Sequence, residues 1–352
     1  MLDIEIKIKR GSLTVKPSQD DQLHVDSSPD LVPEIRGNSV IFDAEHIGGP
    51  VHATILAPVP LGHLDANLGR GPLHVENLNV VTGDLNLGLG NLTVTQCRGK
   101  WDINVGKGDA LVDGIDGDVD MNLGMGKLEM SRVHGQADIS NGLGAVWAKD
   151  CDGHFEVNAG KGDITWKDGG GGSLEMNAGL GSVRIDRGHG TKLEVNAGLG
   201  KVGISNGHWD EAAIETGMGD ITASGSFSQL EIAAKQRGSI QVFLAEDVGA
   251  RVEASTDRGR IVSHLNLIPV GHAGPQRGQR LVGVLGDGQG QVTLHTHRGD
   301  IMLSQGPETN QSTSTRGDSE LDLDSQRALI LQQLSEGTLT VDEAEALLEA
   351  LD

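Results

Sequence analysis

The chain repeats the tripeptide Gly-x-Gly at an almost constant interval of 18 or 19 residues. The first glycines of nine such tripeptides are Gly69, Gly88, Gly106, Gly124, Gly142, Gly160, Gly179, Gly198 and Gly217. Looser copies follow at Arg237-Gly238, Arg258-Gly259 and Arg298-Gly299, whereas residues 265–290 break the pattern. A short, regular period of this kind is typical of a solenoid, in which each repeat is one coil that contacts only its neighbours.

Each unit holds two short segments in which apolar and polar residues alternate. Residues 193–200, LEVNAGLG, show the segment that leads into the glycines, and residues 182–185, SVRI, show the segment that follows them. Alternation is the period of a strand with one buried face. We therefore predict an all-β, single-stranded β-solenoid (β-helix) with coils of 18–19 residues, stacked about 4.8 Å apart.

The composition supports a narrow core and excludes some partners. Only 2% of the residues are aromatic, tyrosine is absent, and 52 of the 352 residues are glycine, so small aliphatic side chains are expected to fill the core. The net charge of −22 disfavours nucleic acid and anionic lipid, because both require clustered Lys and Arg. No apolar stretch is long enough to span a membrane, and residues 1–10 do not read as a signal peptide.

In a solenoid, equivalent positions of successive coils stack into columns. An asparagine column lies two residues before the first glycine and consists of Asn67, Asn86, Asn104, Asn122, Asn158, Asn177 and Asn196, with Ser140 and Glu215 as interruptions. We interpret it as structural: asparagine tolerates the backbone angles of a coil corner, and its amides can bond along the stack.

An acidic column stands two residues before the asparagine column and is expected to face solvent. Its members are Asp65, Asp84, Asp102, Asp120, Asp138, Glu156, Glu175 and Glu194. Like charges at the coil spacing repel one another, so a bound cation or basic peptide would relieve the repulsion. The alternative is a solvated face that resists edge-to-edge association.

The two cysteines test the register of the repeat. Cys97 and Cys151 each lie nine residues after the first glycine of their unit, in a position that is otherwise apolar. They are expected to be buried, reduced, and too far apart for a disulfide.

No motif predicts catalysis, a cofactor or a metal. Residues 198–203 match the dinucleotide pattern G-x-G-x-x-G, but they are one unit of the repeat and no helix-forming segment follows them. The aspartates of residues 113–120 are better interpreted as a solvated turn than as a cation site. His189 and His208 occupy the same position of adjacent coils, but two imidazoles without a third ligand make a poor metal site. We therefore predict a non-enzymatic protein.

The chain divides into four parts by pattern. Residues 1–60 predict irregular N-terminal coils that cap the stack, and residues 61–303 the solenoid repeats. Residues 304–322 are polar and rich in Ser and Thr, which predicts a flexible linker. Residues 323–352 predict a helical hairpin, with Gly337 ending the first helix and Thr340 and Glu343 forming a capping box for the second.

The predicted hairpin carries an apolar face. Helices of about eleven residues are not stable alone, so this face must pack against something. Its candidate docking residues are Leu329, Ile330, Leu334, Leu347, Leu348 and Leu351. We expect the hairpin to bind a protein partner or a second copy of the chain, with a cap on the final coil as the alternative.

These motifs resemble a known family. The segment ILAPVPL at residues 55–61, followed by units such as LEMNAGLGSVRI at residues 174–185, resembles the bacterial toastrack β-helix family, whose members carry the label of adhesins. The ending QQLSEGTLTVDEAEALLEAL at residues 332–351, above all its core from Glu336 to Ala344, resembles SHOCT-type oligomerisation modules. The resemblance implies a scaffold or sensor linked to bacterial cell-envelope stress, with no catalytic residues.

Two functions follow as hypotheses from different classes. The first is a scaffold in the cytoplasm, or at the membrane periphery through a partner, that docks through the hairpin. The second is a surface adhesin, or a protein that binds cations or basic peptides through the acidic column.

Overall fold

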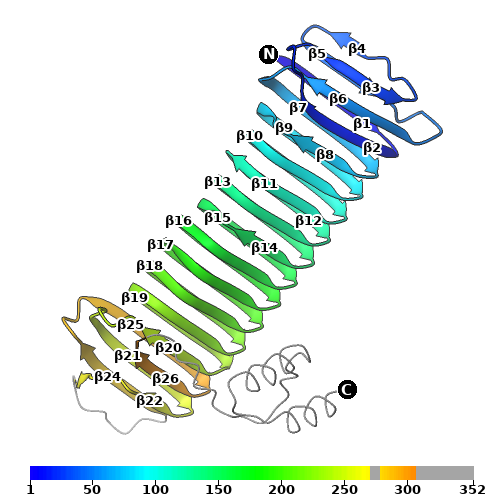
Figure 1. Cartoon of the computed structure of the whole chain (residues 1–352). Helices are drawn as coiled ribbons and strands as arrows, with labels where there is room; N and C mark the ends of the chain where they lie inside the picture. The colour runs from blue at the N-terminus through cyan, green and yellow to red at the C-terminus, as the bar shows by residue number, and fades with distance from the viewer. Residues whose placement is uncertain (270–277, 307–352) are drawn as a thin grey trace, which may run out of the picture. The chain divides into compact units, whose positions relative to one another are not determined.

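The fold is described from a computed structural model, which describes residues 1–269 and 278–306. These residues form stacked β-strands with no helix among them (Figure 1). The predicted all-β solenoid with coils of 18–19 residues is confirmed. The linker predicted at residues 304–322 begins too early, because Ser304 and Gln305 belong to the last described strand, Ile301–Gln305. The rest of the linker, the helical hairpin and its docking residues lie outside the described residues.

Twenty-six strands make up the described stack. The first nine are β1 (Leu2–Ile8), β2 (Gly11–Pro17), β3 (His24–Ser28), β4 (Glu34–Arg36), β5 (Ser39–Asp43), β6 (Val51–Ala57), β7 (Leu61–Arg70), β8 (Leu73–Glu76) and β9 (Asn79–Leu89). The next ten are β10 (Leu92–Lys107), β11 (Ala110–Asp116), β12 (Val119–Met125), β13 (Leu128–Leu143), β14 (Val146–Lys149), β15 (Asp152–Lys161), β16 (Ile164–Leu180), β17 (Val183–Leu199), β18 (Val202–Met218) and β19 (Ile221–Arg237). The last seven are β20 (Ile240–Leu244), β21 (Ala250–Arg258), β22 (Ile261–Ser263), β23 (Ile268–Pro269), β24 (Gln279–Leu285), β25 (Gly290–Arg298) and β26 (Ile301–Gln305).

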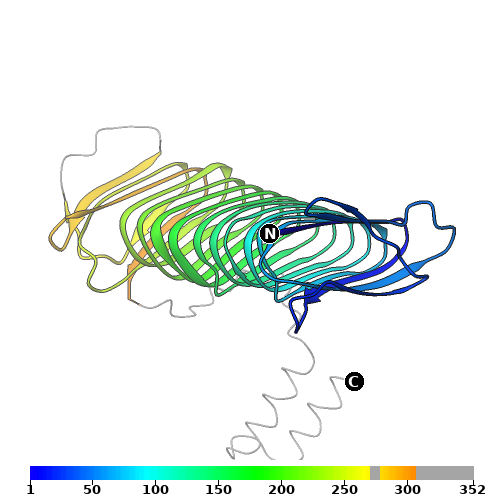
Figure 2. The ribbon, with the colours of Figure 1, turned by 90° about the horizontal axis from the view of Figure 1, so that it is seen from above.

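Successive coils pair in parallel and in register. Leu193 of β17, for example, pairs with Leu174 on one neighbouring coil and with Ala212 on the other. Figure 2 shows the coils as open loops one behind another. Because each residue lies over its equivalent in the next coil, a column of the sequence becomes a line on the surface or in the core.

The second glycine of each Gly-x-Gly is required by how closely the coils approach. Gly90 has a φ of +147°, and a Cβ there would lie 1.9 Å from the carbonyl oxygen of Gly71 on the preceding coil. Gly108 repeats this arrangement over Gly90. Any other residue would clash with the backbone below it, which explains the regularity of the repeat.

The coil corner is not where the sequence placed it. The asparagine column lies within regular strand pairings, and none of its members has a positive φ. The left-handed conformation, with φ between 50° and 55°, belongs to a different column: Asn77, Gln96, Arg132, Asp150, Asp168, Arg187 and Asn206. The expectation that the asparagines form corners is therefore wrong.

The core is a single strip of aliphatic side chains that also holds three tryptophans. Trp101, Trp166 and Trp209 are fully buried, although the composition predicted small aliphatic residues only. Trp101 fits because it pairs with Gly83, where a Cβ would lie 2.4 Å from the indole ring. A small residue on one coil thus makes room for a large one on the next.

The cysteines lie in the core as predicted. Cys97 and Cys151 are free and buried, and Cys97 pairs with Ile115 in the apolar column. Burial raises the pKa of both thiols to about 11. Both therefore remain neutral at physiological pH.

At the N-terminal end, the first strands are not the outermost ones. β1 lies between β5 and β7, and β2 lies between β6 and β8, all in parallel pairings. The short strands β3 and β4 then cover β6 and β5 in antiparallel fashion. Within the predicted lead-in of residues 1–60, residues 2–17 thus form a regular coil, and residues 24–57 carry the irregular part.

At the C-terminal end of the stack, too, later strands insert between earlier ones. β25 inserts between β19 and β21, and β26 inserts between β20 and β22. The outer edge of β21 pairs with the antiparallel β24, which also pairs with β23. The looser repeats at residues 258 and 298 are therefore stacked in reverse order of the sequence.

Candidate functional site

The predicted acidic column forms one line of carboxylates in the structure. Every member pairs in register with the next, from Asp65 with Asp84 to Glu175 with Glu194. All eight are half-exposed or exposed. The structure adds Glu5, which pairs with Asp65 because β1 inserts beside β7. The line ends at Ala213, and the sequence pattern did not predict the membership of Glu5 because residues 2–17 carry no Gly-x-Gly.

The asparagine column lies beside the acidic column and bonds to it within each coil. Six amides donate to the carboxylate two residues earlier, with the shortest bonds from Asn67 to Asp65 at 2.6 Å and from Asn104 to Asp102 at 2.7 Å. Neutral amide donors orient the carboxylates but do not cancel their charge. The two columns together are a face that is rich in acceptors and negatively charged.

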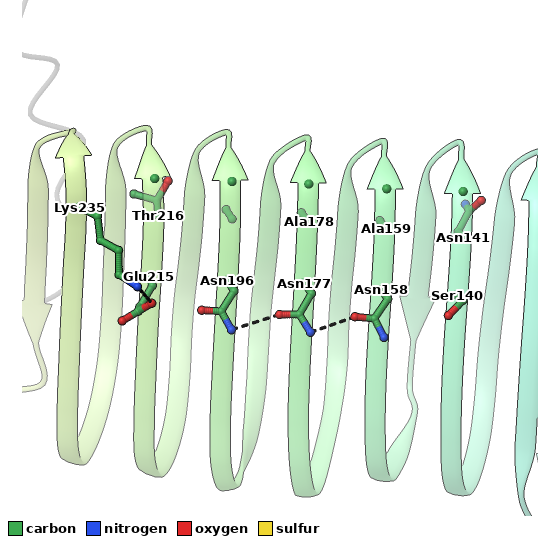
Figure 3. Close-up of a pocket in the computed structure, with 16 residues that line it drawn as sticks. Ser140, Asn141, Asn158, Ala159, Asn177, Ala178, Asn196, Glu215, Thr216 and Lys235 are labelled. Carbon is green, nitrogen blue, oxygen red and sulfur yellow. Dashed lines mark hydrogen bonds and ion pairs between the residues drawn. The ribbon is translucent and has the colours of Figure 1, made fainter.

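Bonding along the stack is confined to one part of the asparagine column. The amide of Asn177 donates to Asn158 at 2.9 Å, and that of Asn196 donates to Asn177 at 3.1 Å (Figure 3). Beyond Asn196 the column continues with Glu215, which forms an ion pair with Lys235. The predicted ladder of amides therefore covers three coils, whereas the bonds within coils are more widespread.

Two carboxylates of the acidic column have raised pKa values, and neighbouring charges contribute to both. The pKa of Asp138 is raised by burial first and then by the charges of Glu156 and Asp120. Its coil has Ser140 where the others have asparagine, so Asp138 receives no amide bond of this kind. The pKa of Asp65 is likewise raised, by burial first and then by Glu5, whereas His63 and the amide of Asn67 oppose the shift. Burial is thus the first cause of both shifts, and the neighbouring carboxylates add to it.

A shallow groove runs beside the asparagine column. One stretch of about 620 Å³ is lined by the column from Ser140 to Glu215 and by the first glycines of the same coils, and Lys235 closes it (Figure 3). A second stretch of about 720 Å³ is lined by the column from Asn67 to Asn122 and by Lys9 and Glu45. The first glycines add no side chains to this lining, and the residues just before them, such as Ala159 and Thr216, complete it. An extended ligand can therefore approach the amides closely.

The other polar groups that the sequence singled out form small, separate contacts. Across residues 1–269 and 278–306, no group of three His, Cys, Asp or Glu side chains is placed to hold a metal ion. Asp113 accepts a hydrogen bond from Ser131 and pairs with Arg132. His189 and His208 do lie side by side on neighbouring coils. No helix in the described part of the chain is long and apolar enough to cross a membrane.

Comparison with known proteins identifies two matching family models. Residues 152–304 match the family described as Toastrack DUF4097, and residues 325–352 match the SHOCT-like domain. No curated protein matches the chain.

Three solved structures match the chain at low identity and low TM-score. A "putative cell adhesion protein" from Clostridium sporogenes has 10% identity and a TM-score of 0.17, with 87% of this chain and 92% of that one covered. A "putative adhesin" from Bacteroides fragilis has 10% identity and a TM-score of 0.22, with coverage of 86% and 92%. One from Parabacteroides distasonis has 12% identity and a TM-score of 0.19, with coverage of 87% and 92%.

Proposed function

We propose that the chain is a non-enzymatic binding scaffold, in which the solenoid that matches the toastrack family model acts together with the segment that matches the SHOCT-like model. The observation that carries the proposal is the line of nine carboxylates, from Glu5 to Glu194, held in register on one face. A stack of paired strands holds such a line rigidly, so little ordering is needed when a partner binds. In this proposal the solenoid presents the face and residues 323–352 dock to a protein or to a second copy.

The docking role is tested by removing residues 323–352 from the full chain. We expect the deletion to lower the oligomeric mass in light scattering or to abolish retention of a partner in a pull-down. Leu334→Glu should have the same effect, because it places a charge on the predicted docking face. Gln333→Glu adds the same charge at a neighbouring polar position and should have no effect. Unchanged mass and unchanged partners in the deletion would refute the docking role.

A second candidate function is the binding of cations or basic peptides by the acidic column. Asp120, Asp138 and Glu156 favour it, because these three consecutive carboxylates form no ion pair within the described residues. The pKa of Asp138 is raised by burial and then by the charges of the other two. Basic side chains placed along the column would form charge-assisted hydrogen bonds with exposed carboxylates. This function fits a surface adhesin as well as a scaffold.

Calorimetry separates this candidate from the first. The full chain is titrated with calcium and, separately, with an oligolysine peptide. We expect heat from the peptide that is lost in the variant Asp120→Asn, Asp138→Asn, Glu156→Gln and is kept in Asp210→Asn, an exposed aspartate outside the column. Absence of heat and of any thermal shift with both ligands would end this proposal.

The compartment and the biological setting are part of the proposal. We place the protein in the cytoplasm, or at the membrane periphery through a partner, in a response to cell-envelope stress. Fractionation of cells that express the full chain tests the first point. Neighbouring genes for membrane stress regulators would support the second.

A further inference from the structure

A line of exposed apolar side chains runs along the solenoid at the glycine turns. The middle residue of each Gly-x-Gly points outward, and in six coils it is a leucine or methionine that is 41–47% exposed. These residues are Leu89, Met125, Leu143, Leu180, Leu199 and Met218. The middle residues pair in register from coil to coil, so they form one continuous line, which we call the turn ridge.

The fold does not require apolar residues at the turn ridge. Lys107 and Lys161 occupy the same position in two coils, and Arg70 and Arg237 occupy it at the two ends. A position that accepts lysine in mid-stack is not a core position. The exposed leucines and methionines are therefore an addition to the fold, and large exposed apolar lines mark sites of interaction.

The cations of the turn ridge also lack partners. Within the described residues, Arg70, Lys107, Lys161 and Arg237 form no ion pair. By contrast, Arg187 at the corner column pairs with aspartates. The four ridge cations are therefore free to meet the carboxylates of a partner. Apolar surface and unpaired positive charge thus coincide on one line.

One stretch combines both features most clearly. Lys161, Leu180, Leu199, Met218 and Arg237 follow one another, with a cation at each end of three apolar side chains. Four coil steps of about 4.8 Å give this stretch a length of about 19 Å. That is the length of an α-helix of about 13 residues.

The shape and charge of this stretch favour one kind of partner. A helix with a leucine stripe presents one side chain per turn of about 5.4 Å, close to the coil spacing of about 4.8 Å. Over the three apolar positions the mismatch is only about 1 Å, so the two rows can interdigitate. Carboxylates at the helix ends would then meet Lys161 and Arg237. A bilayer fits less well, because the ridge is one residue wide and the chain carries a charge of −22.

We propose that the turn ridge from Lys161 to Arg237 is a docking site for an acidic, leucine-striped amphipathic helix of a partner protein. This site is distinct from the acidic column, which carries the proposed function, and it would take a partner of the opposite charge. A scaffold with both lines can hold a basic partner and an acidic one at the same time.

The test uses the full chain and a synthetic helix of known chemistry. The probe is a stapled peptide of about 14 residues, with leucines on one stripe and glutamates beside the first and last leucine; the staple offsets the low stability of short helices. Binding is followed by fluorescence anisotropy. We expect the acidic peptide to bind and its lysine-for-glutamate counterpart to bind at least about tenfold more weakly.

Variants of the chain locate the binding. Leu199→Lys introduces a lysine at a position that is already lysine in another coil, at Lys161. The variant should therefore fold, which circular dichroism checks. The variant should lower the affinity for the acidic peptide by about tenfold or more. Lys161→Glu should weaken it as well. The control Leu111→Lys alters an exposed leucine in another column, between Thr93 and Glu129, and should bind normally.

Three outcomes would overturn the proposal. The acidic peptide fails to bind, or it binds Leu199→Lys as well as it binds Leu111→Lys. In the third, the chain binds vesicles of phosphatidylcholine and phosphatidylserine through Leu199 and ignores the peptide, which would assign the turn ridge to a membrane. Loss of oligolysine binding in the acidic-column variant leaves this test unaffected, so the two proposals fail separately.

Discussion

Replacing Asp138 by asparagine should stabilise the protein. Asp138 stands between Asp120 and Glu156 in the acidic column and has Ser140 in place of the usual amide donor. At the coil spacing of about 4.8 Å, each neighbouring charge costs about 0.9 kcal/mol in water, and physiological salt reduces this to about half. Because the site is exposed and the unfolded chain keeps some repulsion, we expect a net gain of about 0.5–1 kcal/mol for Asp138→Asn.

The pH dependence of this gain has a definite sign. The pKa of Asp138 is raised in the folded state above its ordinary 3.8, so the folded protein binds this proton more tightly than the unfolded chain does. Stability contributed by this group therefore rises as the pH falls from neutrality towards 3.8, and it is lost again as the pH rises. In Asp138→Asn that part of the pH dependence should disappear, and the advantage of the variant should shrink in acid.

Urea unfolding at neutral pH, at pH 5 and in 1 M NaCl measures these effects. The variant's advantage should be largest at neutral pH and low salt, and it should shrink in 1 M NaCl, where the Debye length is about 3 Å. Asp210→Asn makes the same change at an exposed aspartate outside the column and should leave stability unchanged. A loss of stability in Asp138→Asn, or an equal gain in both variants, would refute the view that the column repels itself.

Two further predictions concern the core. Gly83→Ala should destabilise the protein by about 1–3 kcal/mol in urea unfolding, because its Cβ would overlap the buried ring of Trp101. The control is Gly203→Ala, where a Cβ meets nothing within 4 Å. It should leave stability unchanged or raise it by up to about 1 kcal/mol. If both substitutions have the same effect, the proposed fit between glycine and indole is wrong. The second prediction is that Cys97 and Cys151 do not react with Ellman's reagent at pH 8 in the native protein but react fully in denaturant. The reason is that burial raises the pKa of both thiols to about 11. Rapid labelling of the native protein would contradict this.

The regular part of the fold is predictable because its cause is local to each coil. The second glycine of Gly-x-Gly is required wherever one coil passes over another, so the glycine spacing reveals the coil length directly. Once the length is known, the asparagine and acidic columns follow by subtraction. This explains why the register of Asn67 with Asn86, and of Asp65 with Asp84, can be derived from the sequence.

The parts that escaped prediction depend on contacts between coils rather than on a period. The corner column holds residues as different as Arg132, Asp150 and Asn206, so no residue type marks it. The tryptophan pocket depends on a glycine one coil earlier, and composition cannot show such a pairing. The turn ridge was visible as the variable residue of Gly-x-Gly. Its significance required the exposure of Leu199 and its neighbours, which only the structure supplies.

The strand order at the two ends of the stack favours binding at the sides of the solenoid rather than at its ends. β1 and β2 at one end, and β25 and β26 at the other, are each paired on both sides, so the strands next to the regular coils are not edge strands. Beyond them, the antiparallel strands β3 and β24 pair with β6 and β21, which shortens the parallel edge that the described residues offer to a second solenoid. The acidic column and the turn ridge therefore have a set length. A partner that binds to either line must lie alongside the stack and contact several coils at once. Its affinity should therefore depend on how many coils it spans.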